Sequence, residues 1–207
     1  DNDGDLDLFF ANGHLNSVSG DNRQSNLLFE NDGLGHFADI SESSGVLATG
    51  KRIHRGALFA DYNNDGRVDI YVTVNGQQVE DGSGNIVFDA NQGKGILLRN
   101  ETQTENSWIK VRLEGTESNR DGFGTIVNVR TADKLQKQAL SSSQGYFSSN
   151  AKELYFGLKE ADTIDQIDIL WPSGLHQSFQ NIPARQTIYI VEGESLYQNT
   201  LILDQKK

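Results

Sequence analysis

Apolar and polar residues alternate along most of this chain, in short runs that Gly, Asn and Asp interrupt. Alternation with a period of two is typical of β-strands with one buried face, and the interrupting residues are those that turns favour. No stretch predicts a long helix. The pattern therefore predicts an all-β protein, and its clearest strands are residues 69–74, 108–113, 125–130, 164–171 and 187–191.

An internal repeat appears when the glycines are aligned. Residues 1–13 resemble residues 63–76. Each copy is followed by a second short segment of similar sequence, which ends at Asn31 in one copy and at Asn100 in the other. A unit of about 60 residues built from a few short strands has the size of one β-propeller blade. Such a unit cannot bury both of its faces alone.

The two copies diverge in the polar stretch after Asn100, which has no apolar periodicity. Few contacts should cross such a stretch, so we divide the chain into an N-terminal region, residues 1–101, and a C-terminal region, residues 102–207. In the C-terminal region, regularly spaced strands and turns such as Pro172 to Gly174 predict a β-sandwich or barrel.

The acidic loop of the second copy has the spacing of a calcium loop. A hard cation such as Ca²⁺ is held by about six to eight oxygens, and side chains two residues apart in a tight turn converge on one centre. An EF-hand is excluded because Val72, at position 12, has no oxygen to offer and a strand follows the loop. The predicted ligands are the side chains of Asp61, Asn63, Asp65 and Asp69 and the backbone carbonyl of Arg67, around Gly66.

The first copy has the same loop, but the sequence begins at its position 3. The predicted ligands there are Asp1, Asp3, Asp5 and Asp7, around Gly4. We expect weaker calcium affinity at this loop, because one carboxylate ligand is missing. Clusters of Asp and Asn are usually ordinary turns, but two in register within a repeat favour metal binding. We expect the ion to fasten the loop, with no sensing or catalytic role.

Acidic residues outnumber basic ones, with 29 Asp and Glu against 18 Lys and Arg and a net charge of −11. This balance argues against nucleic acid or an anionic membrane as partner and makes cations the natural counter-species. The chain has no Cys and hence no disulfide framework, and no apolar run is long enough for a membrane span. It also lacks an initiating Met and a signal region, which indicates a piece of a longer protein.

Catalytic signatures are weak. The His residues are scattered singly at no zinc-site spacing, and there is no Gly-x-Ser-x-Gly elbow. Carboxylates that hold Ca²⁺ are also poor proton donors, so we expect a protein that is not an enzyme. Four aromatic residues could stack on sugar rings, but strand alternation favours core packing for most of them: Trp108, Tyr146, Phe147 and Trp171.

The second acidic loop resembles those of FG-GAP/VCBS repeats in integrin-like β-propellers, where Asp-x-Asp-x-Asp-Gly-x-x-Asp loops bind calcium between blade strands. Arg67 stands where these repeats more often have Asp, but a carbonyl ligand does not depend on the side chain. The resemblance implies a partial propeller of one to two blades.

The C-terminal region looks like an ASPIC/UnbV domain. Thr125 stands where that family more often has Ala, and Lys159 where it often has Gly. The order of repeats and domain is similar to that of the cartilage acidic protein family, which implies a secreted, periplasmic or cell-surface calcium-binding protein with an adhesive role and no known catalytic activity. The motifs that carry the likeness are residues 118–124, 143–148, 155–158 and 171–174.

Together these features predict an all-β fragment, a partial β-propeller followed by a β-sandwich-like domain, that binds or adheres outside the cell with calcium in a mainly structural role. The expected partner is an unidentified protein or glycan. Two alternatives stay open: a carbohydrate-binding module, or a non-catalytic part of a secreted carbohydrate-active enzyme.

Overall fold

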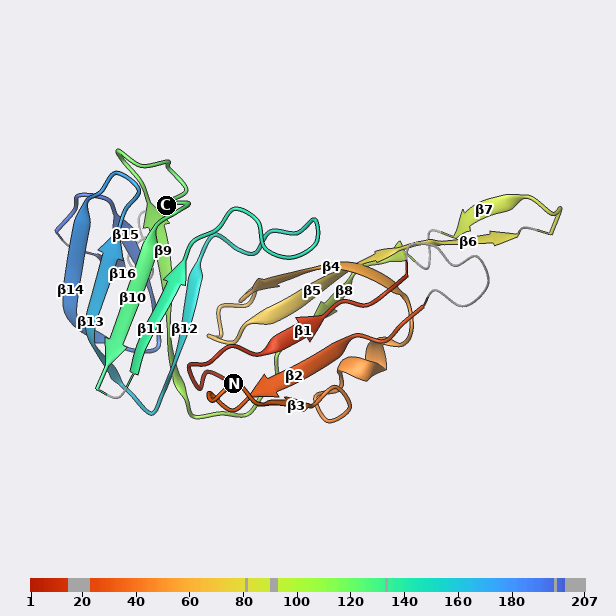
Figure 1. The fold of residues 1–207 in the computed structure, drawn as a ribbon, viewed down its shortest axis with the longest axis horizontal. Helices are drawn as coiled ribbons and strands as arrows, with labels where there is room; N and C mark the ends of the chain where they lie inside the picture. The colour runs from red at the N-terminus through yellow and green to blue at the C-terminus, as the bar shows by residue number, and fades with distance from the viewer. Residues whose placement is uncertain (15–22, 81, 90–92, 133, 196, 200–207) are drawn as a thin grey trace.

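The structure is a computed structural model that describes residues 1–14, 23–80, 82–89, 93–132, 134–195 and 197–199 (Figure 1). Strands make up 46% of the chain and helix 3%, and no barrel closes among these residues. The predicted all-β class is therefore confirmed. No helix in the described ranges is long and apolar enough to cross a membrane.

The N-terminal region forms two small antiparallel sheets, a hairpin and one turn of helix. The first sheet has the order β1-β2-β3, with β1 (Leu8–Phe10), β2 (Leu27–Asn31) and β3 (Phe37–Asp39), and is followed by the 3-10 helix η1 (Val46–Thr49). The second sheet has the order β4-β5-β8, with β4 (Ile53–Ala60), β5 (Asp69–Asn75) and β8 (Ile96–Leu98), and the hairpin joins β6 (Gln77–Glu80) to β7 (Ile86–Asp89).

The two sheets are copies of one unit. The β1–β2 ladder pairs Leu8 with Phe29, and the β5–β8 ladder pairs Ile70 with Leu98. β1 therefore corresponds to β5 and β2 to β8, as the internal repeat predicted. This equivalence supports the reading of the region as part of a propeller built from repeated units.

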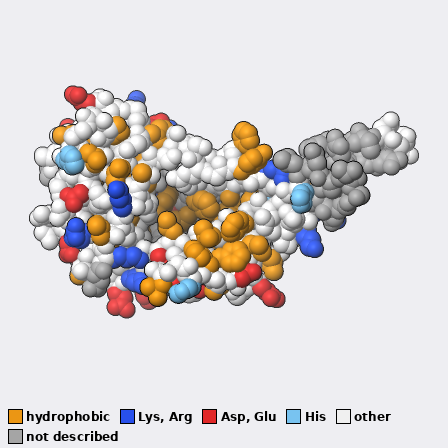
Figure 2. Space-filling model, viewed as in Figure 1, with side chains coloured by type: hydrophobic (Ala, Val, Ile, Leu, Met, Phe, Trp, Pro, Cys, Tyr) orange, Lys and Arg blue, Asp and Glu red, His pale blue; other side chains and the backbone are white. Residues whose placement is uncertain are grey.

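The sheets pack through one face and leave others open. The ring of Phe9 on β1 meets the ring of Phe59 on β4 edge to face, with centroids 6.4 Å apart. On the opposite face of the first sheet, Leu8, Phe10 and Phe37 are exposed. Figure 2 shows hydrophobic side chains gathered over β1 and β2 and in the hollow beside them. A repeat unit is expected to use such faces to pack on neighbouring units.

The C-terminal region is a sandwich of two four-stranded sheets. One sheet has the order β11-β10-β13-β14, from β10 (Ile126–Thr131), β11 (Lys134–Ala139), β13 (Thr163–Leu170) and β14 (His176–Pro183). The other has the order β12-β9-β15-β16, from β9 (Ser107–Glu114), β12 (Leu154–Lys159), β15 (Gln186–Val191) and β16 (Gln198–Asn199). The other strand pairs of these two sheets are antiparallel, but β9 and β15 pair in parallel.

Alternating residues of these strands form the core between the sheets. Ile109, Val111 and Leu113 of β9 point inward, so Trp108 and Lys110 lie on the other face of the same strand. That other face meets the N-terminal region instead of solvent. The innermost side chains of the core include Ile109, Val111, Val127, Val129, Phe156, Ile164, Ile167, Ile169, Trp171, Ile188 and Ile190.

Both acidic loops lie against the C-terminal region. A Cβ on Gly66 would lie 2.0 Å from the Trp108 ring, and a Cβ on Gly4 would lie 2.8 Å from the carbonyl oxygen of Gly157. The backbone N–H of Lys159 donates to the Asn2 carbonyl oxygen over 3.1 Å. The loops are thus part of the contact between the two regions. The division at residue 102 falls in the connection between β8 and β9.

Candidate metal centre

We call residues 1–7 the first loop and residues 61–69 the second loop. The two have the same backbone conformation, because Asn2 and Asn64 both take a left-handed φ, of 67° and 58°, and so do Gly4 and Gly66, of 86° and 84°. A left-handed φ is strained for most side chains and free for glycine, which explains the glycine in each loop. The spacing that defined the repeat therefore encodes one loop geometry.

The side chains of each loop also bond its own backbone in the same way. The N–H groups at positions 5 and 7 each donate to the side-chain oxygen two residues earlier, over 3.0–3.2 Å. Such turns aim alternate oxygens at the inside of the loop. The bonded pairs are Asp3 with Asp1, Asp5 with Asp3, Asp65 with Asn63, and Arg67 with Asp65.

The last acid of each loop bonds an asparagine at or just beyond the end of a paired strand, β2 in one copy and β8 in the other. Asp7 Oδ1 accepts the N–H of Asn31 over 2.9 Å, and Asp69 Oδ1 accepts the N–H of Asn100 over 2.8 Å. In the second loop the other oxygen of Asp69 accepts the N–H of Tyr62. Asp69 is buried, whereas Asp7 is exposed.

Charge is where the loops differ, and in the first loop it is unbalanced. Burial and the nearby carboxylates of Asp3 and Asp7 together raise the pKa of Asp5 to about 6, against a small lowering by Lys134. Asp5 Oδ1 is buried with no hydrogen-bond partner. Asp5 and its neighbouring carboxylates can therefore all be charged only if a cation lies among them; otherwise one of them takes up a proton.

In the second loop protein cations contact the acids. Nη2 of Arg67 lies 2.6 Å from Oδ2 of Asp65, which also accepts a bond from the Asn63 amide over 2.8 Å. Burial alone would raise the Asp65 pKa, but the bonds from Arg67 and Asn63 lower it below its usual value. The Asp65 carboxylate is therefore stabilised in its charged form without a metal.

Lys110, from the C-terminal region, completes this arrangement. Its side chain is fully buried, and its Nζ donates to Asp61 Oδ2 over 3.0 Å and to Asn64 Oδ1 over 2.9 Å. The same Asp61 oxygen accepts the N–H of Gly66 over 3.0 Å, and Oδ1 accepts the N–H of Asp65. The sequence did not identify Lys110 or Asn64 as part of the site.

The two loops consequently fit a calcium ion to different degrees. No three Asp, Glu or His side chains of the described ranges converge closely enough to hold a metal by themselves, so carbonyl oxygens and water would have to complete any site. The first loop fits a cation, since the buried Asp5 oxygen has no partner. In the second loop Lys110 and Arg67 already contact the acids, and the fit is poor. At the first loop Asp5 would hold the ion together with a neighbouring acid, Asp1, Asp3 or Asp7, and with carbonyl oxygens and water.

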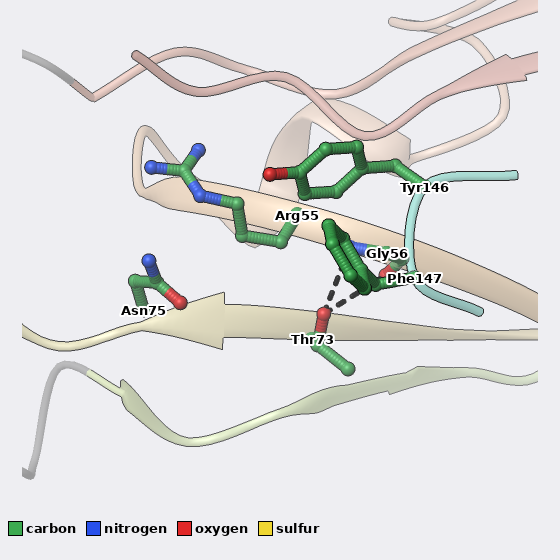
Figure 3. A pocket seen from close by; sticks show the side chains of 6 residues that line it. All are labelled: Arg55, Gly56, Thr73, Asn75, Tyr146 and Phe147. Carbon is green, nitrogen blue, oxygen red and sulfur yellow. Dashed lines mark hydrogen bonds between the residues drawn. The ribbon is translucent and has the colours of Figure 1, made fainter. Parts of the chain in front are cut away.

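A second feature is a hollow of about 300 Å³ between β4, β5 and the loop of residues 141–150. In Figure 3 the rings of Tyr146 and Phe147, 4.8 Å apart and edge to face, stand beside Arg55. Phe147 is 92% exposed and has a φ of 47°, which is rare for a bulky residue. The expectation of core packing is confirmed for Trp171 but wrong for Tyr146 and Phe147.

The C-terminal region contains a buried carboxylate that, unlike that of Asp5, has hydrogen-bond donors on both of its oxygens. Glu192, 3% exposed, accepts the N–H groups of Thr116, Glu117 and Ser118 over 2.7–2.9 Å. The hydroxyls of Ser118 and Ser173 also donate to it. Burial raises its pKa, but these donors outweigh burial and lower the pKa to about 2. Glu192 thus links two of the motifs on which the resemblance depends.

Comparison with known families agrees with this geometry. The family model for the FG-GAP-like repeat matches residues 1–72, and the model for ASPIC and UnbV matches residues 115–196. A search of the curated proteins found no match. The first match contains both acidic loops, and the second contains β10 to β15 of the sandwich and Glu192. The chain is thus an FG-GAP repeat protein that carries an ASPIC/UnbV domain.

Proposed function

We propose that this chain is a calcium-dependent binding module of the extracellular type, in which one Ca²⁺ at the first loop fastens the repeat against the ASPIC/UnbV domain. FG-GAP and ASPIC/UnbV domains are those of an extracellular-type repeat and binding module. The observation that carries the proposal is the buried Asp5 oxygen without a partner, beside the carboxylates of Asp3 and Asp7. A divalent cation would balance this charge and supply the missing partner.

The position of the first loop favours a structural role for the ion. The loop lies between the second loop, where Asn2 donates to the Gly66 carbonyl over 3.1 Å, and β12, where it contacts Gly157 and Lys159. An ion held there would stiffen a contact between two parts of the chain. We therefore expect the ion to act on stability and orientation.

We also propose that the module adheres or binds outside the cell and does not catalyse a reaction. The second-loop acids already accept bonds from backbone amides and protein cations, which leaves them poorly placed as proton donors. The net charge of −11 disfavours nucleic acid as partner. An exported protein would meet the millimolar calcium that a weak extracellular site needs.

Thermal unfolding with calcium and with a chelator tests the calcium proposal. At a calcium concentration about 100 times its Kd, a single site should add about 2.7 kcal/mol to the free energy of unfolding. Asp5→Asn should remove this gain. Asp32→Asn is the matched control, since Asp32 is an exposed acid that pairs with His36. A melting temperature that ignores both calcium and chelator would refute the proposal.

Carbohydrate binding is a second candidate, favoured by the exposed pair Tyr146 and Phe147 beside Arg55. The apolar C–H face of a sugar ring can stack on an aromatic ring, and its hydroxyls can bond polar groups at the edge of the hollow. The strained backbone of Phe147 is also typical of functional sites. Binding on a glycan array should vanish in Phe147→Ala and persist in Leu135→Ala, an exposed leucine elsewhere. Binding that survives Phe147→Ala would exclude this hollow.

A further inference from the structure

We propose that the second loop takes no calcium, because Lys110 and Arg67 supply its positive charge from within the chain. The inference refines the proposed function and rests on it in one respect, since it assigns the ion to the first loop alone. It departs from the sequence pattern, which predicts calcium ligands in both loops. The contacts of the two cations carry the argument.

Lys110 is placed by strand alternation. Its neighbours Ile109 and Val111 point into the sandwich core, so the lysine projects from the opposite face of β9. There it is fully buried between the second loop, Glu153 and the Tyr155 ring. Its Nζ donates to Asp61 and Asn64 over 3.0 and 2.9 Å and lies farther from Glu153, at 3.8 Å. A buried ammonium needs such partners, because an unpaired charge away from water is very costly.

Arg67 acts on the other side of the loop. It stands at position 7, and its side chain turns back to Asp65, two residues earlier, over 2.6 Å. The Asn63 amide donates to the same Asp65 oxygen. Position 7 was expected to contribute only a carbonyl, for which the side chain is irrelevant. The structure shows that this side chain brings a charge to the loop.

A calcium ion would meet these cations at short range. It needs its oxygens within about 2.3–2.6 Å. Asp61 and Asp65 would therefore hold the ion within a few ångströms of the ammonium and the guanidinium that contact the same carboxylates. Like charges at that separation repel, most strongly at Lys110 and Asp61, whose side chains are fully buried.

The first loop has less of this compensation. Its position 7 is Asp5, so the residue equivalent to Arg67 adds a negative charge. The Lys134 ammonium lies close to this loop, 3.3 Å from where a Cβ on Gly4 would stand, but its effect on the Asp5 pKa is smaller than that of burial or of the neighbouring acids. The two repeats therefore close the same loop by different means. The ASPIC/UnbV domain supplies Lys110 to one of them.

Calorimetric titration of the whole chain with calcium chloride, after removal of metal with a chelator, measures the number of sites. We expect one ion per chain. Asp65→Asn should leave that number unchanged, and Asp5→Asn should reduce it to none. A wild-type chain that binds two ions, one of which is lost in Asp65→Asn, would overturn the inference and leave the proposed function standing.

Removing the internal cations should open the second loop to calcium. Lys110→Met and Arg67→Gln should each gain one ion, which a further Asp65→Asn change abolishes. Arg67 is only partly buried, so Arg67→Gln decides the matter if Lys110→Met does not fold. Arg120→Met is the matched control, because Arg120 is an exposed cation that pairs with Glu114 at the end of β9. No gain in either variant overturns the inference.

The same titrations separate the two proposals. If the wild type binds no calcium, the proposed function fails. The inference then stands only if Arg67→Gln or Lys110→Met acquires an ion that Asp65→Asn removes. If neither variant acquires one, both proposals fall.

Discussion

The first and second loops share a backbone and differ in charge. Both have a left-handed glycine, the same bonds from positions 5 and 7, and a final aspartate that accepts the N–H of an asparagine at or just beyond the end of β2 or β8. Yet one leaves a buried carboxylate oxygen unpartnered, and the other surrounds its acids with two protein cations. Ligand spacing therefore determines the shape of such a loop. Its charge depends on the residue at position 7 and on neighbours that are distant in sequence, such as Lys110.

The largest effect that this comparison predicts concerns the two loop glycines. Gly66→Ala places a Cβ 2.0 Å from the rigid ring of Trp108 at a left-handed φ. The left-handed backbone costs about 1–2 kcal/mol and overpacking typically about 1–3 kcal/mol more. We expect a loss of more than about 3 kcal/mol in the free energy of unfolding, measured with urea.

The matched changes distinguish strain from contact. Gly174→Ala has the same left-handed φ but nothing near the new Cβ, so it should cost only the backbone strain. Gly4→Ala should lie between the two, because its Cβ meets the Gly157 carbonyl at 2.8 Å. If Gly66→Ala costs no more than Gly174→Ala, the second loop does not pack against β9 as the structure has it.

The next largest effect concerns Glu192, whose buried carboxylate accepts several hydrogen bonds, whereas one buried oxygen of Asp5 accepts none. Glu192→Gln should destabilise the sandwich by about 2–3 kcal/mol at neutral pH, since hydrogen bonds to a charged group are lost. The pKa of Glu192 is lowered from 4.5 to about 2, so its contribution is complete above pH 4.5 and is lost as the pH falls towards 2. Urea unfolding between pH 2 and 7 measures this.

In the Glu192→Gln variant that part of the acid dependence should be absent. Ser143→Ala is a control, because this exposed serine belongs to another motif and does not contact Glu192. A variant with the same decline in stability below pH 4.5 as the wild type would show that other acids cause it.

Most strands could be predicted from sequence because their alternation reflects one buried face. The predicted segments 69–74, 108–113 and 187–191 lie within β5, β9 and β15. The parallel pairing of β9 with β15 could not be predicted, since alternation does not specify partners. The same limit applies to the burial of Lys110. Its face of β9 looks solvent-exposed in the sequence, and a loop more than 40 residues away covers it.

The family departures noted in the sequence also have physical consequences. Lys159 stands where the family often has Gly, and its φ is 51°, in the region that favours glycine. Thr125 stands where the family more often has Ala, and its hydroxyl oxygen is buried without a partner. Neither residue changes the fold. The backbone conformation at position 159 suits Gly, and the burial of position 125 suits a side chain without a hydroxyl, such as Ala.

A smaller effect follows from exchanging position 7 between the loops. Asp5→Arg gives the first loop the residue that the second loop has, so an arginine should pair with Asp3 as Arg67 pairs with Asp65. Without calcium the variant should be at least as stable as the wild type, because carboxylate repulsion is relieved. The gain of about 2.7 kcal/mol expected at saturating calcium should disappear. Melting curves with calcium and with chelator measure both quantities, and a retained calcium gain would contradict the role of Asp5.

The smallest effect tests whether the two repeats are equivalent where they are geometrically alike. Asn31 and Asn100 each donate a side-chain amide to a backbone carbonyl, that of Leu6 over 3.3 Å and that of Val68 over 3.2 Å. Such a bond contributes about 0.5–1.5 kcal/mol, and more when its loss leaves a buried group unpaired. The bond of Asn100 is partly buried and that of Asn31 is exposed, so Asn100→Ala should cost more than Asn31→Ala in urea unfolding. Equal costs would mean that the two loops are equally solvated, and the contrast between them would then rest on Lys110 and Arg67 alone.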